Sequence, residues 1–183
     1  MDAPRLISDD YRRTQVELHK NPKYGTASVN VAPIVANVIR SNKVTELLDY
    51  GAGKGRLGEA LKKLGAFPSK LHHYDPAIPT WAKTPAPAEM VACIDVLEHI
   101  EPEYLDNVLD DLQRVTRRLG IFSVATRPAQ KVLPDGRNAH LIQEGPGWWL
   151  PRFLTRFELE KFDKIFDGFI IAVTPLGTTS TGT

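Results

Sequence analysis

The stretch that decides the fold is Val44-Thr45-Glu46-Leu47-Leu48-Asp49-Tyr50-Gly51-Ala52-Gly53-Lys54-Gly55. A short apolar run ends here in alternating glycines, and apolar residues then recur at helical spacing from Leu57 to Leu64. This order predicts a strand, a glycine turn and a helix. Ligands of open α/β sheets bind at the carboxyl ends of the strands, where glycines let the backbone approach them closely. We therefore expect this turn to hold a ligand.

Strand-like and helix-like segments alternate along the rest of the chain. We expect strands over residues 44–50, 71–74, 90–96, 121–125, 157–162 and 169–174. We expect helices over 34–39, 57–64, 102–119 and 148–154, and a short one through Leu18 that Asp9 or Asp10 caps. The alternation predicts an α/β domain with a mostly parallel sheet. The last two strands, joined at Asp167-Gly168, would add an antiparallel hairpin at one edge.

Composition narrows the class of protein. The chain has 183 residues, with 23 Lys and Arg against 22 Asp and Glu, a net charge of +1. This predicts a single domain and argues against a surface that coats DNA. The single cysteine, Cys93, excludes an internal disulfide framework and a multi-cysteine zinc site. No signal pattern or membrane-length apolar run is present, so we expect a soluble cytoplasmic protein without a membrane partner.

Two acidic residues at strand ends indicate the ligand. The segment Gly53-x-Gly55-x-x-Gly58 matches a dinucleotide fingerprint, but Asp49 would repel a pyrophosphate. The same carboxylate favours a ligand with an ammonium or sulfonium group, and S-adenosylmethionine (SAM) carries both. Asp75, after the next strand, suits a ribose diol because a carboxylate can accept from both hydroxyls. SAM is therefore favoured over NAD.

The motifs resemble those of class I SAM-dependent methyltransferases. Residues 47–55 resemble the first motif of that family, Tyr74-Asp75-Pro76 its ribose-binding motif, and Cys93-Ile94-Asp95-Val96-Leu97-Glu98-His99-Ile100 a segment of many small-molecule members. Short bacterial and phage-encoded members are the most similar. The resemblance implies a Rossmann-like fold, SAM as methyl donor with S-adenosylhomocysteine as product, and a cytoplasmic location, in the host if phage-encoded. It also implies that Gly51, Gly53 and Gly55 flank the methionine part of SAM and that Asp75 holds its ribose.

The connection between the second and third strands departs from the family layout. Only 13 residues, Pro76 to Ala88, stand where the family has a helix and a strand, and their four prolines exclude a regular helix. We therefore expect six strands rather than seven, with strand 71–74 at an edge. The adenine then needs other contacts, for which we expect Pro76, Ala77, Ile78 and Trp81. In the alternative, Trp81 covers the sheet face left bare by the missing helix.

The candidate chemical groups follow the third strand. His99 and Glu98 are the candidate catalytic residues, with His99 as general base because its unperturbed pKa is about 6.5. A packing or substrate-positioning role for His99 is the alternative, and Asp95 is expected to orient the cofactor. Together with His140 these residues could hold a divalent metal. The run is similar to that of metal-dependent methyltransferases of RNA 3′ ends and quinone catechols, although we expect activity without a metal.

Two further segments are candidates for substrate recognition. The polar loop 127–149 follows the fourth parallel strand, and we expect Arg127, Arg137, His140 and Trp148 to bind the substrate. The alternative is a solvated loop anchored by a tryptophan. Tyr11, His19 and Tyr24 belong to an N-terminal segment that could cover the site or simply pack against it.

These expectations combine into one reading of the chain. We expect residues 1–30 to form a helical lid, 31–175 a SAM-binding core and 176–183 a flexible tail. The expected activity is methyl transfer from SAM to O or N of a small molecule or nucleotide. The alternatives are a metal-assisted RNA 2′-O-methyltransferase, a non-catalytic SAM-binding module that acts through a partner, and an NAD-linked oxidoreductase. The sequence carries no signal for oligomeric state.

Overall fold

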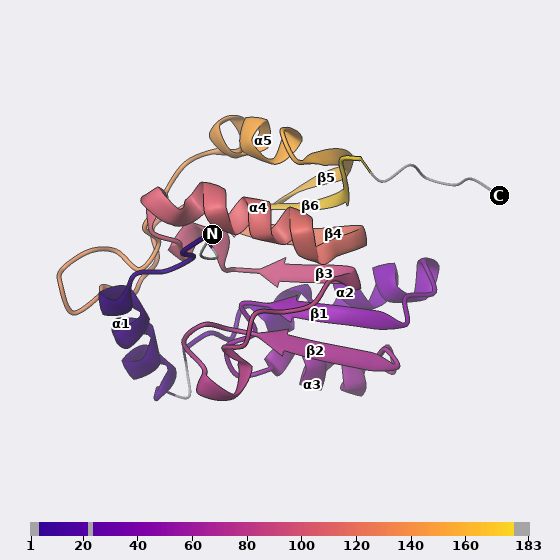
Figure 1. Cartoon of the computed structure of the whole chain (residues 1–183), viewed down its shortest axis with the longest axis horizontal. Helices are drawn as coiled ribbons and strands as arrows, with labels where there is room; N and C mark the ends of the chain where they lie inside the picture. The colour runs from indigo at the N-terminus through magenta and orange to yellow at the C-terminus, as the bar shows by residue number, and fades with distance from the viewer. Residues whose placement is uncertain (1–3, 22–23, 178–183) are drawn as a thin grey trace.

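The computed structural model describes residues 4–21 and 24–177 (Figure 1). The helices are α1 (Asp9–His19), α2 (Ser28–Ser41), α3 (Arg56–Lys63), α4 (Leu105–Val115) and α5 (Pro146–Leu154). The strands are β1 (Glu46–Tyr50), β2 (Lys70–Tyr74), β3 (Ala88–Ile94), β4 (Thr116–Ala125), β5 (Phe157–Ile165) and β6 (Gly168–Pro175). Single 3-10 turns are η1 (Pro79–Trp81), η2 (Leu97–His99) and η3 (Pro102–Tyr104). Within the described ranges, no helix has the length and apolar character needed to cross a membrane.

One mixed sheet of six strands organises the chain in the order β2-β1-β3-β4-β6-β5. Neighbouring strands from β2 to β4 are parallel, whereas β6 runs antiparallel to both β4 and β5. The expected α/β fold with a C-terminal antiparallel pair is therefore confirmed. The expected count of six strands and the edge position of β2 are confirmed as well.

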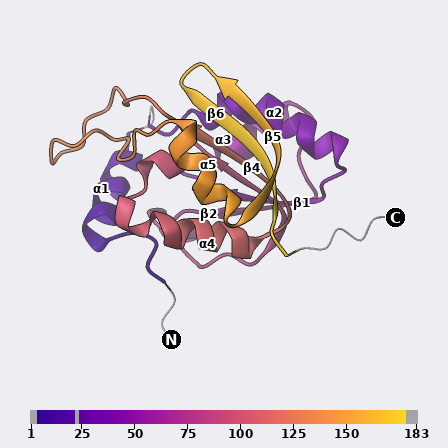
Figure 2. The same cartoon turned by 90° about the horizontal axis from the view of Figure 1, so that it is seen from above.

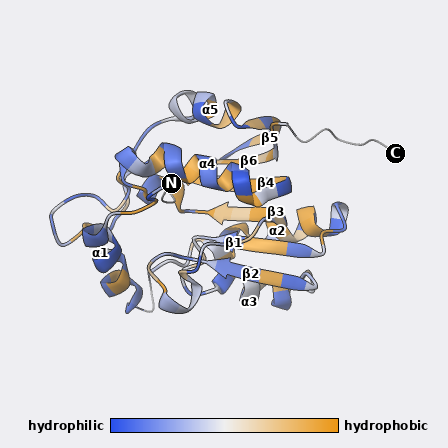
Figure 3. Cartoon of the chain, in the orientation of Figure 1, coloured by the Kyte–Doolittle hydropathy of each residue, from blue (hydrophilic) through white to orange (hydrophobic). Residues whose placement is uncertain are grey.

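Helices cover both faces of the sheet, with α2 and α3 on one side and α4 and α5 on the other (Figure 2). Successive residues of β3 serve the two faces alternately, as the strand geometry requires. Val91 and Cys93 pack with α4, whereas Met90 and Ala92 pack with α2 and α3. This burial on both sides explains why β3 is almost continuously apolar (Figure 3).

The connection from β2 to β3 contains the 3-10 turn η1 and no α-helix. The indole of Trp81 stacks on the imidazole of His73 in β2, with ring centroids 4.4 Å apart and an interplanar angle of 15°. Nearer β3, the guanidinium of Arg114 donates to the carbonyl of Pro85 at 3.2 Å. The short connection is therefore fixed at both ends, to its own edge strand and to α4.

Two expected helix ends were wrong. Ser8, not Asp9 or Asp10, caps α1, because the Ser8 hydroxyl accepts from the backbone N–H of Tyr11 at 3.1 Å. Gly120 does not end a helix: α4 ends at Val115, and Gly120 lies inside β4. The pairing of Thr116–Leu119 with β3 extends β4 back to the end of α4. The local sequence does not reveal this tertiary contact.

Glycine and proline positions differ from expectation in two other places. The turn residues of the β5–β6 hairpin are Phe166 and Asp167, and Gly168 begins β6. Gly168 is needed for close approach rather than for its φ, because a Cβ there would lie 1.9 Å from the carbonyl oxygen of Val124. The helix expected over 34–39 starts earlier, at Ser28, so Pro33 lies inside it. Of the expected tail, residues 178–183 lie outside the described residues.

Candidate functional site

A cavity of about 660 Å³ lies at the carboxyl ends of the parallel strands, a size typical of small-molecule sites. Figure 1 shows α1 beyond the arrowheads of these strands, where its residues line the cavity. The predicted residues in the lining are Asp49, Gly51, Gly53, Asp75, Pro76, Ala77, Asp95, His99, Arg127 and His140, with Tyr11, His19 and Tyr24 from the N-terminal segment. The predicted residues outside it are Gly55, Ile78, Trp81, Glu98, Arg137 and Trp148.

The glycine turn after β1 has a backbone that requires glycine. Gly51 and Gly53 have φ values of 78° and 52°, in the left-handed region that other residues rarely adopt. A Cβ on Gly51 would also lie 2.4 Å from a methyl group of Val96. The amides of Gly51 and Ala52 donate to the carbonyl of Tyr74 at 2.8 and 3.0 Å, which ties this turn to the end of β2.

Two buried carboxylates border the turn, and they differ in their hydrogen bonds. Asp75 accepts from the amides of Gly53 and Ala77, both at 2.9 Å. Asp49 is 4% exposed, and its Oδ2 has no hydrogen-bond partner among the described residues. Burial, followed by the nearby charge of Asp75, raises the pKa of Asp49 to about 7. A cationic ligand in the cavity would offset this cost of charging Asp49.

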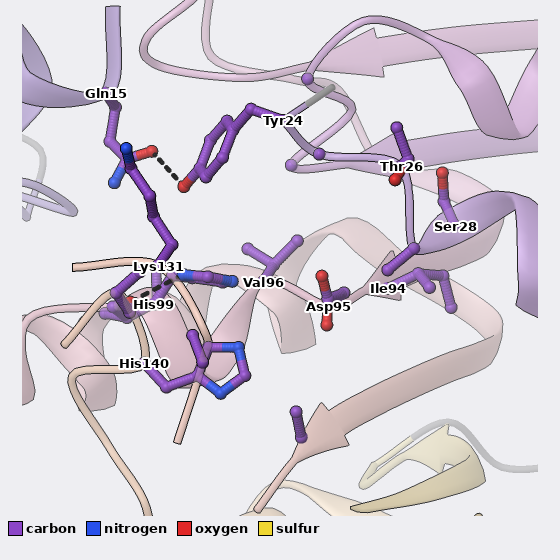
Figure 4. Close-up of a pocket in the computed structure, with 18 of the residues that line it drawn as sticks. Gln15, Tyr24, Thr26, Ser28, Ile94, Asp95, Val96, His99, Lys131 and His140 are labelled. Atoms are coloured by element: carbon purple, nitrogen blue, oxygen red, sulfur yellow. Dashed lines mark hydrogen bonds between the residues drawn. The ribbon is translucent and has the colours of Figure 1, made fainter. Parts of the chain in front are cut away.

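The imidazoles of His99 and His140 are both oriented by backbone carbonyls. The Nδ1 of His99 lies 2.8 Å from the carbonyl oxygen of Ala139, and the Nδ1 of His140 lies 2.6 Å from that of Arg127. Because a carbonyl only accepts, each Nδ1 donates, and each neutral ring keeps a lone pair on Nε2. The rings meet edge to face with centroids 4.8 Å apart (Figure 4).

Burial shifts the pKa values of His99 and Glu98. Burial lowers the pKa of His99, and this effect outweighs the charge of Asp95, which raises the pKa. His99 is therefore neutral at neutral pH and can accept a proton. Glu98 is 0% exposed, and burial, followed by the charge of Asp95, raises its pKa well above the ordinary value. One oxygen of Glu98 accepts from the amide of Ala125 at 2.6 Å, and the other is buried without a partner among the described residues.

The four side chains of Asp95, Glu98, His99 and His140 converge. Each offers one ligand atom, and these atoms lie within 4.8 Å of one another. The set supplies carboxylate oxygens and imidazole nitrogens, which suit divalent transition metals. The carbonyl partners of both Nδ1 atoms are the kind that orient metal-binding histidines. The donor set therefore fits a metal ion as well as a proton-transfer role.

Several hydrogen bonds hold α1 against the core. The amide and hydroxyl of Ser8 donate to the carboxylate of Glu101 at 2.8 and 2.6 Å. The phenol of Tyr11 donates to the carbonyl of His99 at 2.8 Å. Lys54, from the glycine turn, donates to the carbonyl of Tyr24 at 2.9 Å. The N-terminal segment is thus tied both to the glycine turn and to η2.

Gln15, which the sequence reasoning missed, lies on the cavity-facing side of α1 between Tyr11 and His19. Its side-chain oxygen accepts from the phenol of Tyr24 at 3.1 Å (Figure 4). Its Nε2 and the Nδ1 of His19 are buried without a partner among the described residues. The spacing Tyr11-x-x-x-Gln15-x-x-x-His19 puts these side chains on one helix face and could have revealed the residue. The hydrogen-bonding capacity of both atoms is therefore unused by the described residues.

Lys131 and Phe166 are among the other lining residues that the sequence did not single out. The predicted residues outside the lining have partners of their own. The guanidinium of Arg152 lies 3.5 Å from the ring centroid of Trp148. The guanidinium of Arg137 pairs with Asp135 at 2.7 Å.

No protein-family model matches the chain, and no curated protein sequence matches it. Solved structures do match. The 1,6-didemethyltoxoflavin-N1-methyltransferase of Burkholderia thailandensis, with 1,6-didemethyltoxoflavin and S-adenosylhomocysteine bound, is similar with a TM-score of 0.64 at 14% identity, over 96% of this chain and 93% of that chain.

Two further matches belong to the same fold. The methyltransferase domain of bacterial CtHen1-CN has a TM-score of 0.61 at 15% identity, over 80% of this chain and 99% of that chain. Magnesium protoporphyrin IX methyltransferase from Synechocystis PCC 6803, with S-adenosylhomocysteine bound, has a TM-score of 0.57 at 12% identity, over 91% and 94%. The chain therefore has the Rossmann-like fold of class I methyltransferases.

Proposed function

We propose that this protein is a SAM-dependent methyltransferase that methylates O or N of a small molecule or nucleotide. The observation that carries the proposal is the buried carboxylate of Asp49, which lacks a partner among the described residues and lines the cavity beside the glycine turn. A cationic ligand suits such a group, whereas a pyrophosphate would be repelled. The likeness to solved methyltransferases supports the same conclusion.

The residues around the glycine turn fit the other parts of SAM. In this proposal Gly51 and Gly53 lie against its methionine part, and Asp95 orients it. Each oxygen of Asp75 accepts one backbone hydrogen bond and keeps a lone pair for a ribose hydroxyl. Pro76 and Ala77 flank the adenine. When bound, SAM supplies the electrophilic methyl group.

The protein's own contribution to the chemistry is to position the acceptor and remove its proton. His99 lines the cavity with its Nε2 lone pair available, and burial keeps its imidazole neutral. We propose that Nε2 of His99 takes the proton of an acceptor hydroxyl or amine. Positioning is the main catalytic effect, and general base catalysis adds to it. We also propose that residues 1–30 form the lid of a core made by residues 31–175.

Calorimetric titration with SAM, S-adenosylhomocysteine and NAD tests the proposal directly. We expect both sulfur compounds to bind and NAD not to bind. Asp75→Asn should weaken binding about tenfold or more, because the amide removes one of the ribose acceptors. Asp135→Asn, a change of an exposed acid outside the cavity, is the matched control. Binding of NAD alone would refute the proposal, and binding without turnover on a panel of acceptors would favour a non-catalytic module.

A second candidate function is metal-assisted 2′-O-methylation of RNA, and the convergence of Asp95, Glu98, His99 and His140 favours it. A bound metal would act as a Lewis acid towards an acceptor hydroxyl. Cobalt(II) is a suitable probe because its visible spectrum reports ligation. We expect an absorption band that His140→Gln abolishes and that the exposed control His72→Gln keeps. Absence of cobalt binding, together with full activity in excess EDTA, would exclude this candidate.

A further inference from the structure

Phe166 is a large apolar side chain left in water at the edge of the cavity. Its side chain is 89% exposed, more than any other large apolar residue in the described part of the chain, yet it lines the cavity. Ligand pockets are lined mainly by hydrophobic and aromatic side chains, with a few polar or charged groups that orient the ligand. Its place in the lining makes Phe166 a candidate contact for a ligand.

The turn that carries Phe166 is fixed in place. The carbonyl of Asp167 accepts from the amide of Thr126 at 2.8 Å. Gly168 pairs with Ala125, and a Cβ at Gly168 would meet the carbonyl oxygen of Val124 at 1.9 Å. The hairpin turn thus rests on the carboxyl end of β4, which holds the backbone of Phe166 at the edge of the cavity.

A cation without an ion-pair partner among the described residues lies at this ring, and a second one lines the same cavity. The guanidinium of Arg127 lies 5.2 Å from the ring centroid of Phe166. Its side chain has no hydrogen bond or ion pair with another described residue, and the same holds for Lys131, which also lines the cavity (Figure 4). By contrast, Arg118 and Arg156 pair with carboxylates at 2.6 and 2.5 Å. The backbone carbonyl of Arg127 also accepts from His140, and both cations line the same cavity as His99 and His140.

We propose that Phe166, Arg127 and Lys131 form the acceptor subsite and that the acceptor is a planar aromatic molecule with an anionic group. The aromatic ring of the acceptor stacks on Phe166, and its phosphate or carboxylate binds Arg127 and Lys131. This inference rests on the proposed function, because it takes the cavity to be the site of methyl transfer. It narrows the acceptor from any small molecule to an aromatic anion.

Binding to the protein loaded with S-adenosylhomocysteine tests the subsite. The probes are GMP and guanosine, 4-hydroxybenzoate and phenol, and inorganic phosphate, titrated by calorimetry. We expect at least one aromatic anion to bind about tenfold more tightly than its neutral counterpart and than phosphate. A preference for GMP indicates a nucleotide, and a preference for 4-hydroxybenzoate indicates an aromatic carboxylate. Equal affinity for the charged and neutral probes, or no binding of any probe, would overturn the inference.

Matched variants assign the effect to the ring and the charge. Phe166→Leu and Arg127→Met should each weaken the preferred anion about tenfold, with Arg127→Lys restoring part of the affinity. Phe67→Leu, at a phenylalanine 51% exposed outside the cavity, and Arg13→Met are the controls. Unchanged anion binding in Phe166→Leu would refute the role of the ring. The affinity of the protein for S-adenosylhomocysteine is measured in parallel. If this compound does not bind, the proposed function fails, and the same probes are then titrated into the protein without it.

Discussion

Asp49 links the stability of the protein to pH. Burial and the charge of Asp75 raise its pKa to about 7 in the folded protein, against about 3.9 for an unfolded chain. Between these values the folded protein holds a proton that the unfolded chain has lost. The contribution of Asp49 to the free energy of unfolding therefore falls as pH rises through this window.

We predict that Asp49→Asn is more stable than the parent at about pH 8 and that the difference shrinks towards about pH 4. The reason is that Asn avoids the cost of a buried charge. Thermal unfolding of both proteins across this pH range measures the difference in melting temperature. A difference that stays constant with pH would contradict the raised pKa.

The same residue should have the opposite effect on ligand binding. Because a cationic ligand favours ionised Asp49, affinity for S-adenosylhomocysteine should rise from about pH 6 to about pH 8, by up to tenfold per pH unit below the pKa. In Asp49→Asn, binding should be weaker and this pH dependence should be lost. Titrations at several pH values, with Asp135→Asn as control, decide the matter. A variant that binds as tightly as the parent would remove Asp49 from the site.

At the scale of single elements, α1 depends on Ser8. Its hydroxyl caps the helix and, with its amide, binds Glu101. Ser8→Ala should cost about 1 kcal/mol in the docking of α1. We expect faster hydrogen exchange of the α1 amides and severalfold weaker ligand binding, with little change in the global melting temperature. Thr14→Ala, on the same helix but outside the cavity lining, should change neither.

The short connection after β2 gives a test of Trp81. Because Trp81 stacks on His73 and does not line the cavity, Trp81→Ala should lower stability by about 1 kcal/mol and leave the affinity for S-adenosylhomocysteine unchanged. Chemical denaturation and calorimetry measure the two effects. The reverse pattern, weak binding with full stability, would assign Trp81 to the adenine.

Elements whose signals are local were predictable from the sequence, and those set by distant contacts were not. The glycine turn was predictable because left-handed backbone requires glycine, and β3 because burial on both faces requires an apolar run. The extension of β4 through Gly120 depends on pairing with β3. Gln15 and Phe166 reach the cavity only because α1 and the hairpin turn dock there. The helical spacing of Tyr11, Gln15 and His19 shows that they share one face of α1, but it does not show where that face docks.

The whole molecule divides energetically into a sheet core and an N-terminal cover. The two main apolar clusters combine the sheet with α2 to α5, whereas Tyr11 and Leu18 of α1 belong to a separate, smaller cluster with the loop residues Leu133 and Ala139. A truncated chain that begins at Ser28 should therefore unfold cooperatively at a lower temperature. It should bind S-adenosylhomocysteine about tenfold less tightly or worse, because α1 lines the cavity. Loss of cooperative unfolding would mean that residues 1–27 belong to the core.

The burial of Cys93 has a practical consequence. Its side chain is 0% exposed inside β3, and burial raises the pKa of its thiol well above the ordinary value. A thiolate is the reactive form, so this cysteine should resist maleimide reagents. A cysteine introduced at Arg13, on the exposed side of α1, would then be the one reactive thiol of the chain. A fluorophore attached there would report the environment of α1 with and without ligand, with no native residue to remove first.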